Sequence, residues 1–312
     1  MLGPGRYLLG VVEITLLAGF AWLGATTIRR RLVPEIDGLT AQLATSVIAL
    51  ALLLWAGEIL GTIGLFAAVP YTAAVIVIGV LIWTFFRGWR QGEGVSAARR
   101  LLRAGHEPSH RDVLLPEAAR SARTAPHPGD RTRGREADIA TLVALGIAAV
   151  AVIHFAAGVK TRLSTGMTGF DSTWYHGPFA AGFFQSADTW SLHFIAPQFL
   201  AWFYPANSEL LHAMGIVAFS RDILSPLLNL GWFVGCLVAA WCIGRPYRVA
   251  PWSMALAAIA LSVPALSDQA GEARNDIVGI FFLLAAVAIV LAQRERSSHL
   301  PASGTAFALG PA

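Results

Sequence analysis

The side chains best suited to chemistry lie in one segment, residues 160–222, which separates two strongly apolar runs. Within it, Asp171 is followed four and five residues later by Tyr175 and His176. A carboxylate near a histidine and a tyrosine is suited to general acid–base catalysis. If both apolar runs cross a membrane, these groups lie where lipid meets water, as an enzyme acting on a lipid-linked substrate requires.

Further polar side chains precede and follow this group. Arg274 is the best candidate for a phosphate contact, because a guanidinium fork matches phosphate oxygens. It lies in a second polar loop, residues 267–276, between two later apolar runs. With Tyr175 and His176, the candidates for substrate binding are Lys160, Arg162, Asn207, Glu209, Glu272, Arg274, Asn275 and Asp276.

Each of the main candidates also has a purely structural interpretation. Asp171 could cap a helix N-terminus, and acids with unusual environments serve structure as well as catalysis. His176 could be an ordinary interfacial histidine. Arg274 could pair with Glu272 or Asp276, and Asp276 could complement the dipole of the helix that follows it.

The composition of the chain is that of a membrane protein. Hydrophobic residues make up 55% of it and charged residues only 13%, whereas a soluble domain carries charge at roughly a quarter of its positions. A membrane span needs about 20 mostly apolar residues, and seven segments qualify. They lie near residues 7–28, 40–58, 66–86, 138–159, 223–243, 251–267 and 276–292. We therefore expect an all-α, polytopic bundle of about seven transmembrane helices.

The distribution of basic residues predicts the orientation, because Lys and Arg concentrate in cytoplasmic loops. With Arg29, Arg30 and Arg31 inside, the inner segments hold 18 basic residues and the outer ones five. The N-terminus and residues 160–222 are then outside and the C-terminus is cytoplasmic. This predicts a multi-pass protein of the plasma membrane.

Four parts follow along the chain. Residues 1–86 form a three-span N-terminal block, in which Glu13 is an intramembrane acid without an evident partner. Residues 87–137 form a basic cytoplasmic linker, expected to be disordered around 121–135 because it has no apolar period. Residues 138–296 carry the outer loop and the remaining spans, and 297–312 form a flexible tail.

The large outer loop is expected to contain two helices lying along the membrane interface. The first runs from Pro178 to Gln185, with phenylalanines on one side, and the second from Asn207 to Phe219. Trp190, Trp202 and Tyr204 would be at home at that interface as well.

Several other functions find no support in the sequence. Nucleic-acid binding would require basic residues interleaved with aromatic ones, but here the two lie in different parts of the chain. Cys236 and Cys242 are six residues apart in one apolar run, which suits neither a metal pair nor a disulfide framework. No metal ligands and no cofactor are predicted; a divalent metal remains an unsupported option.

Three stretches together resemble the GT-C superfamily of membrane glycosyltransferases. They read Phe-Asp-Ser-Thr-Trp-Tyr-His-Gly-Pro-Phe at residues 170–179, Tyr-Pro-Ala-Asn-Ser-Glu-Leu at 204–210, and Asn-Asp at 275–276. The pattern is similar to the dolichyl-phosphate-mannose mannosyltransferase and RgtA/B/C/D-like families over roughly residues 138–292. The resemblance implies an outward-facing site and a sugar donor carried on a polyprenyl phosphate. It also implies a catalytic acid in the first large outer loop, where Asp171 is the matching residue.

The chain departs from that family in two respects. Ser172 stands where many relatives have a second acid, so a pair of acids or a bound metal is not implied here. Relatives place the large loop after their first span and continue with more spans. We therefore expect residues 1–86 to be an extension, and the rest to correspond to the N-terminal part of a longer enzyme.

The leading hypothesis is thus a glycosyltransferase that moves a sugar from a polyprenyl phosphate to a hydroxyl group of a glycan, lipid or protein. Asp171 would be the general base, and Arg274, with Lys160 or Arg162, would stabilise the departing phosphate. One alternative is a transporter or flippase, a class that places polar groups at mid-membrane in broken helices. The other is a non-catalytic membrane scaffold whose outer loop binds a partner.

Overall fold

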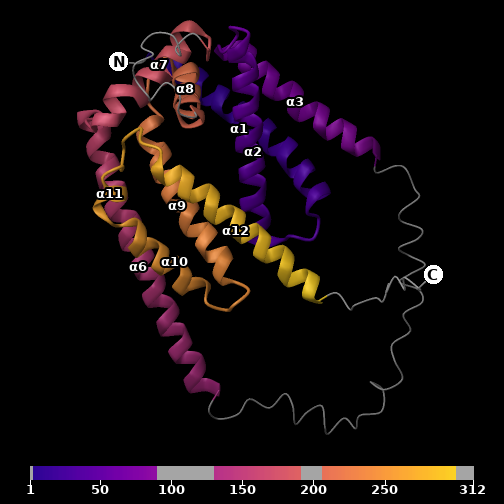
Figure 1. The fold of residues 1–312 in the computed structure, drawn as a ribbon, viewed down its shortest axis with the longest axis vertical. Helices are drawn as coiled ribbons and strands as arrows, with labels where there is room; N and C mark the ends of the chain where they lie inside the picture. The colour runs from indigo at the N-terminus through magenta and orange to yellow at the C-terminus, as the bar shows by residue number, and fades with distance from the viewer. Residues whose placement is uncertain (1–2, 90–129, 191–205, 300–312) are drawn as a thin grey trace, which may run out of the picture.

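A computed structural model of the chain describes residues 3–89, 130–190 and 206–299, and this part is an all-α bundle without strands (Figure 1). Six of its helices are long and apolar enough to cross a membrane. They are α1 (Pro4–Leu32), α2 (Gly38–Thr62), α3 (Ala68–Trp89), α6 (Asp130–Thr165), α9 (Ser225–Gly244) and α12 (Asp276–His299). The protein is therefore a polytopic membrane protein, as its composition predicts.

The ends of the long helices form two groups, and α9 and α12 both run opposite to α2. At one end, the start of α2 meets the ends of α9 and α12, because Asp37, Cys242 and Ala292 line one small cavity. At the other end, the backbone N–H of Phe66, after α2, donates to the carbonyl of Ala187 at 2.9 Å. The described parts of the predicted outer segments, residues 160–190, 206–222 and 267–276, belong to this second end, which we call the loop end.

The predicted span over residues 251–267 is not a full-length helix. α10 (Ala250–Leu261) has only 12 residues, about 18 Å of helix, against a hydrocarbon core of about 30 Å. The helix stops because Val263 precedes Pro264, and a residue before proline avoids the helical region; Val263 is extended, with ψ 147°. A four-residue helix, α11 (Pro264–Ser267), and a loop complete the passage to α12.

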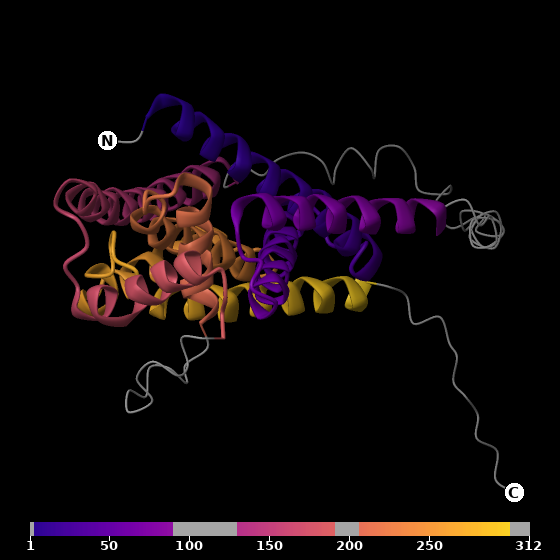
Figure 2. The ribbon, with the colours of Figure 1, turned by 90° about the horizontal axis from the view of Figure 1, so that it is seen from above.

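Small residues let the helices of the N-terminal block approach closely, as is usual in membrane bundles. A side chain at Gly79 of α3 would come within 2.5 Å of the carbonyl oxygen of Phe20 in α1. Figures 1 and 2 both place α2 between α3 and α9, so this block packs directly against the rest of the bundle. Glu13 does have a partner: its carboxylate lies 3.6 Å from the guanidinium of Arg6.

Two short helices at the loop end lie where the sequence predicts them. α7 (Gly177–Ser186) has Pro178 in its first turn, a position that suits proline. α8 (Asn207–Phe219) does not lie on the surface of the bundle as expected: every residue from Ser208 to Phe219 is buried. The helices α1, α2 and α7 cover it, and Nη2 of Arg6 donates to the carbonyl of Val217 at 2.9 Å.

The predicted linker over residues 87–137 lies mostly outside the described residues. Its last part is described, and it is helical from Asp130 onward, not disordered up to residue 135. The apolar run that follows, residues 139–165, continues the same helix. Trp202, Tyr204 and most of the predicted tail also lie outside the described part.

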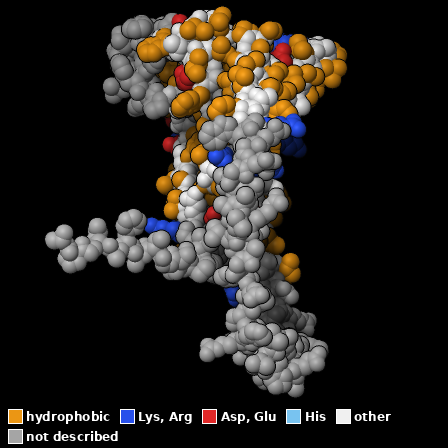
Figure 3. All heavy atoms as spheres, turned by 90° about the vertical axis from the view of Figure 1, so that its right-hand side faces the viewer, with side chains coloured by type: hydrophobic (Ala, Val, Ile, Leu, Met, Phe, Trp, Pro, Cys, Tyr) orange, Lys and Arg blue, Asp and Glu red, His pale blue; other side chains and the backbone are white. Residues whose placement is uncertain are grey.

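The outer surface of the bundle matches its membrane setting. Seen from the α3 side, the described surface is mostly hydrophobic, with few charged side chains (Figure 3). Large apolar side chains that would be costly to expose to water are exposed here, such as Trp55 at 73% and Leu81 at 60%. Lipid chains can cover such residues, so this exposure is expected in a membrane protein.

Candidate functional site

The site is built on a loop, residues 268–275, that enters the bundle between α11 and α12. Four successive residues of it, Ala270 to Ala273, are buried. Buried irregular backbone needs internal hydrogen-bond partners in a membrane protein. Asn229 of α9 supplies them: its amide nitrogen lies 2.9–3.0 Å from the carbonyl oxygens of Gln269, Glu272 and Arg274, which share its two N–H donors.

A second segment, residues 166–176, is fixed against this loop by side chains of opposite charge. The carboxylate of Glu272, 1% exposed, forms an ion pair with Arg162, whose Nε lies 2.8 Å away, and accepts a hydrogen bond from the backbone N–H of Thr168 at 3.1 Å. Ser172 adds a further contact, because its hydroxyl accepts from the backbone N–H of Ala273 at 2.9 Å. These contacts join the end of α6 to the loop and set the position of Asp171 between them.

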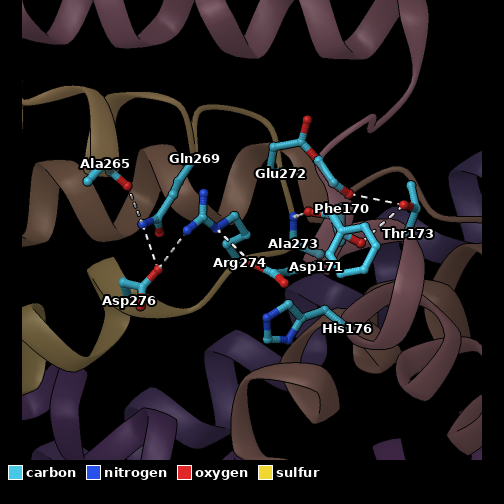
Figure 4. Close-up of polar contacts among 12 residues, drawn as sticks. Phe170, Asp171, Thr173, His176, Ala265, Gln269, Glu272, Ala273, Arg274 and Asp276 are labelled. Atoms are coloured by element: carbon cyan, nitrogen blue, oxygen red, sulfur yellow. Dashed lines mark hydrogen bonds and ion pairs between the residues drawn. The ribbon is translucent and has the colours of Figure 1, made fainter. Parts of the chain in front are cut away.

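Asp171 and Arg274 meet at this junction. Nε of Arg274 lies 3.5 Å from a carboxylate oxygen of Asp171, and Nη2 lies 3.6 Å from Asp276. Figure 4 shows the side chains of Arg274 and Gln269 converging on Asp276, where Nε2 of Gln269 donates at 2.8 Å. About a third of the Asp171 and Arg274 side chains is exposed. They are therefore accessible to a ligand, unlike the buried contacts that hold them.

This arrangement decides between the structural alternatives for these residues. Asp171 does not act as an N-cap: it is itself helical and makes no side-chain capping hydrogen bond at the π-helical turn η1 (Ser172–His176). Arg274 pairs with Asp276 but not with Glu272, whose partner is Arg162. Asp276 lies in the first turn of α12, where a negative charge complements the helix dipole.

A buried polar cluster lies beside this surface pair. Nδ1 of His176 hydrogen-bonds Oε1 of Glu209 from α8, and both residues are at most 3% exposed. The ring of Tyr175 lies 4.0 Å from the His176 ring. Oε2 of Glu209 and Nδ1 of His212, one turn further along α8, have no hydrogen-bond partner among the described residues. His176 and Glu209 therefore contact each other, and are not accessible to a substrate in this conformation.

The environment of His212 strongly favours its neutral form. Burial lowers the pKa of His212 to about 3, the nearby His176 lowers it too, and a hydrogen bond with the Ala273 backbone opposes the shift. A buried imidazole has few polar groups to solvate a positive charge. His212 therefore stays uncharged at neutral pH and links α8 to the buried loop.

The remaining predicted site residues have no described contact with the Asp171–Arg274 pair, although Asn275 is next to Arg274 in the sequence. Lys160 is exposed on α6, and Asn275 directly precedes α12. Asn207 lines a separate cavity of about 360 Å³ together with Trp55 and Glu58 of α2. Of the eleven candidates, the structure thus gathers Asp171, Arg274 and Asp276 in one contact, Arg162 with Glu272 in a second, and His176 with Glu209 in a third.

Three residues that the sequence analysis did not single out hold this site together: Asn229, His212 and Gln269. Asn229 could have been recognised, because an amide inside an otherwise apolar span is costly and therefore informative. His212 and Gln269 gave no such signal, since each lies in a stretch with several other polar residues.

Two questions about identity can be answered briefly. Within the described ranges, no three His, Cys, Asp or Glu side chains are placed to hold a metal ion. Comparisons with protein-family models, curated proteins and solved structures gave no match for this chain. Its function must therefore be inferred from the chemistry of the site: an accessible carboxylate beside an accessible guanidinium, at the edge of a membrane bundle.

Proposed function

We propose that the protein is a membrane glycosyltransferase that transfers a sugar from a polyprenyl phosphate to an acceptor hydroxyl at the loop end of the bundle. The observation that carries this proposal is the contact between Asp171 and Arg274, at 3.5 Å. A general base and a phosphate-binding cation have to lie near the same reacting carbon, and these two side chains satisfy that requirement.

In the proposed reaction, the hydroxyl oxygen of the acceptor attacks the anomeric carbon of the donor sugar. Its proton passes to the carboxylate of Asp171, while the bond from the anomeric carbon to the phosphate oxygen breaks. The polyprenyl phosphate leaves with its negative charge, which Arg274 stabilises. Asp276 holds Arg274 from its other side, and Gln269 in turn donates a hydrogen bond to Asp276.

The proposed site faces the outside of the cell, because the loop end lies opposite the basic end of the bundle. Basic residues favour the cytoplasm, and the other end of the bundle carries Arg29, Arg30 and Arg31 at the end of α1. The loop end would then face outward, at the plasma membrane. There a lipid-linked donor can reach Arg274 from the bilayer, while a glycan, lipid or protein acceptor arrives from water.

The decisive experiment replaces Asp171 by Asn in the full chain, reconstituted in vesicles with polyprenyl-phosphate sugars. Asn keeps the shape but cannot accept the proton, so turnover should fall by about a hundredfold or more. The control is Asp268→Asn, which removes an exposed acid from the facing loop, residues 268–275. A scaffold or a flippase would give no sugar transfer in either protein. Transfer at normal rate by Asp171→Asn would reject this residue as the base.

A further inference from the structure

A second feature of the bundle lies away from the candidate site: a cavity of about 500 Å³ between α2 and α9. Cavities that bind small ligands have volumes of about 300–1,000 Å³. Trp22 of α1 and Phe281 of α12 contribute to its walls, and leucines supply most of the rest. The polar side chains in the lining are Gln42 and Ser46, both on α2. The occupant of this cavity must therefore be predominantly apolar.

The shape of the cavity suits one hydrocarbon chain. Along α9 its lining runs from Leu224 to Val238, a distance of about 20 Å. The hydrocarbon core of a bilayer is about 30 Å thick, so each leaflet contributes chains of about half that length. All lining residues belong to, or directly precede, helices that are long enough to span the membrane. A lipid tail can therefore enter the cavity directly from the bilayer.

The cavity extends toward the end of the bundle that is opposite the loop end. Arginines lie beside it there. A side chain at Gly38, next to the lining residue Leu39, would come within 3.3 Å of Nη1 of Arg245. Arg29 donates from Nη1 to the carbonyl of Ile36 at 3.1 Å, and its Nε is buried without a hydrogen-bond partner in the described part of the chain. Residues 29–38 and 244–249 hold five arginines and two acids. The excess of positive charge favours a ligand with an anionic head.

We infer that this cavity binds one tail of an anionic phospholipid, whose phosphate contacts Arg29 and Arg245. Basic pockets between membrane helices commonly bind anionic lipid headgroups, and guanidinium groups match phosphate oxygens. The polyprenyl donor of the proposed reaction is a different ligand, because its phosphate has to reach Arg274 at the loop end. This site is therefore independent of the proposed activity.

Native mass spectrometry of the full chain in mild detergent tests the inference, with added phosphatidylglycerol or phosphatidylcholine as probes. The wild-type protein should retain phosphatidylglycerol in preference to phosphatidylcholine. Arg29→Gln and Arg245→Gln should each weaken retention of phosphatidylglycerol by about fivefold, the effect of one basic residue on an anionic lipid. Retention of phosphatidylcholine should change little, because only the charge of the site is altered.

A matched pair of glycine variants tests the cavity itself. Gly231 lines the cavity, and a Cβ added there meets nothing within 4 Å, so Gly231→Phe should fill the space without a backbone clash. Gly279→Phe is the control, because Gly279 of α12 has the same free space but does not line this cavity. Loss of retained lipid in Gly231→Phe alone would support the site. Equal retention of both lipids by the wild type, unchanged retention in Gly231→Phe, or preferential retention of a polyprenyl phosphate would overturn it.

Discussion

The carboxylate of Asp171 and the guanidinium of Arg274 meet at 3.5 Å, and each is about one-third exposed. Their supports are buried: Ser172 binds the backbone at Ala273, and Asn229 binds three carbonyls of the loop that carries Arg274. An exposed ion pair contributes little to the free energy of unfolding, even where the residues that carry it are held by buried hydrogen bonds. Its position is therefore better explained by binding than by folding.

Arg274→Gln should reduce kcat/KM for a polyprenyl-phosphate sugar by roughly tenfold to a hundredfold. A loss of this size is what removing hydrogen bonds between charged groups in the transition state would cause. Arg274→Lys keeps the charge and should lose less. Arg221→Gln, which removes an exposed arginine before α9, is the control and should have little effect. Full activity in Arg274→Gln would show that this residue does not contact the leaving phosphate.

Asn229→Leu should destabilise the protein by about 2–4 kcal/mol, because several buried carbonyls lose their donor at once. The measurement is thermal unfolding of the protein in detergent. Gln42→Leu provides the comparison, since it removes an amide of similar chemistry that is exposed on α2. An equal change in melting temperature for the two variants would mean that the buried loop does not depend on Asn229.

The ion pair between Arg162 and Glu272 should behave differently when one partner or both are removed. Glu272→Leu leaves a charge without its partner and should cost about 3–5 kcal/mol. The double variant Arg162→Leu/Glu272→Leu should recover much of this loss, because an apolar pair can replace a buried ion pair. If the double variant is less stable than Glu272→Leu, then these two residues do not stabilise the protein mainly through their ion pair.

The free energy of unfolding should decrease as the pH is lowered, because the buried His212 resists protonation in the folded protein. Its pKa is about 3 in the folded protein and about 6.5 in an unfolded chain. Between these two values only the unfolded state takes up the proton. The contribution of His212 to stability is therefore complete above about pH 6.5 and decreases by about 1.4 kcal/mol for each pH unit below it. His212→Gln should flatten the decline in melting temperature between pH 7 and pH 5. The exposed His154, changed to Gln, should leave the decline as steep as in the wild type.

The orientation can be tested with single cysteines in a Cys236→Ala/Cys242→Ala background. Ser164→Cys is at the loop end and Glu35→Cys is in the loop between α1 and α2, both exposed. An impermeant thiol reagent should label the first in intact cells and the second only after the membrane is opened. The opposite pattern would place the candidate site in the cytoplasm.

The sequence was sufficient to predict the long helices, because an apolar run of membrane length has few other conformations available. It also located the start of α7, where Pro178 occupies the first turn. It overestimated the length of the helix around α10, because the apolar run continues through Ser262 to Leu266 although the backbone turns before Pro264. An estimate of span length from hydrophobicity alone does not take account of the restriction that Pro264 places on the backbone before it.

The partners within the site could not be predicted. His176 meets Glu209, and Arg162 meets Glu272, across separations that a helical or strand period does not cover. Several acids and bases lay within the same two segments, so many pairings were equally compatible with the sequence. Their choice depends on how α6, α8 and the buried loop pack together. The burial of α8 was missed for the same reason, because two of the helices that cover it, α1 and α2, come from the distant N-terminal block.

The covering of α8 has a consequence for biogenesis. The ring of Phe219 packs so closely on Gly10 of α1 that a Cβ at Gly10 would clash with it, and a Cβ at Gly57 of α2 would come within 3.0 Å of Leu210. The ribosome makes α1 and α2 well before α8, so the receiving surface is already in the bilayer when α8 emerges. A chain made without the N-terminal block would therefore lack the α1 and α2 surfaces against which the polar helix α8 packs.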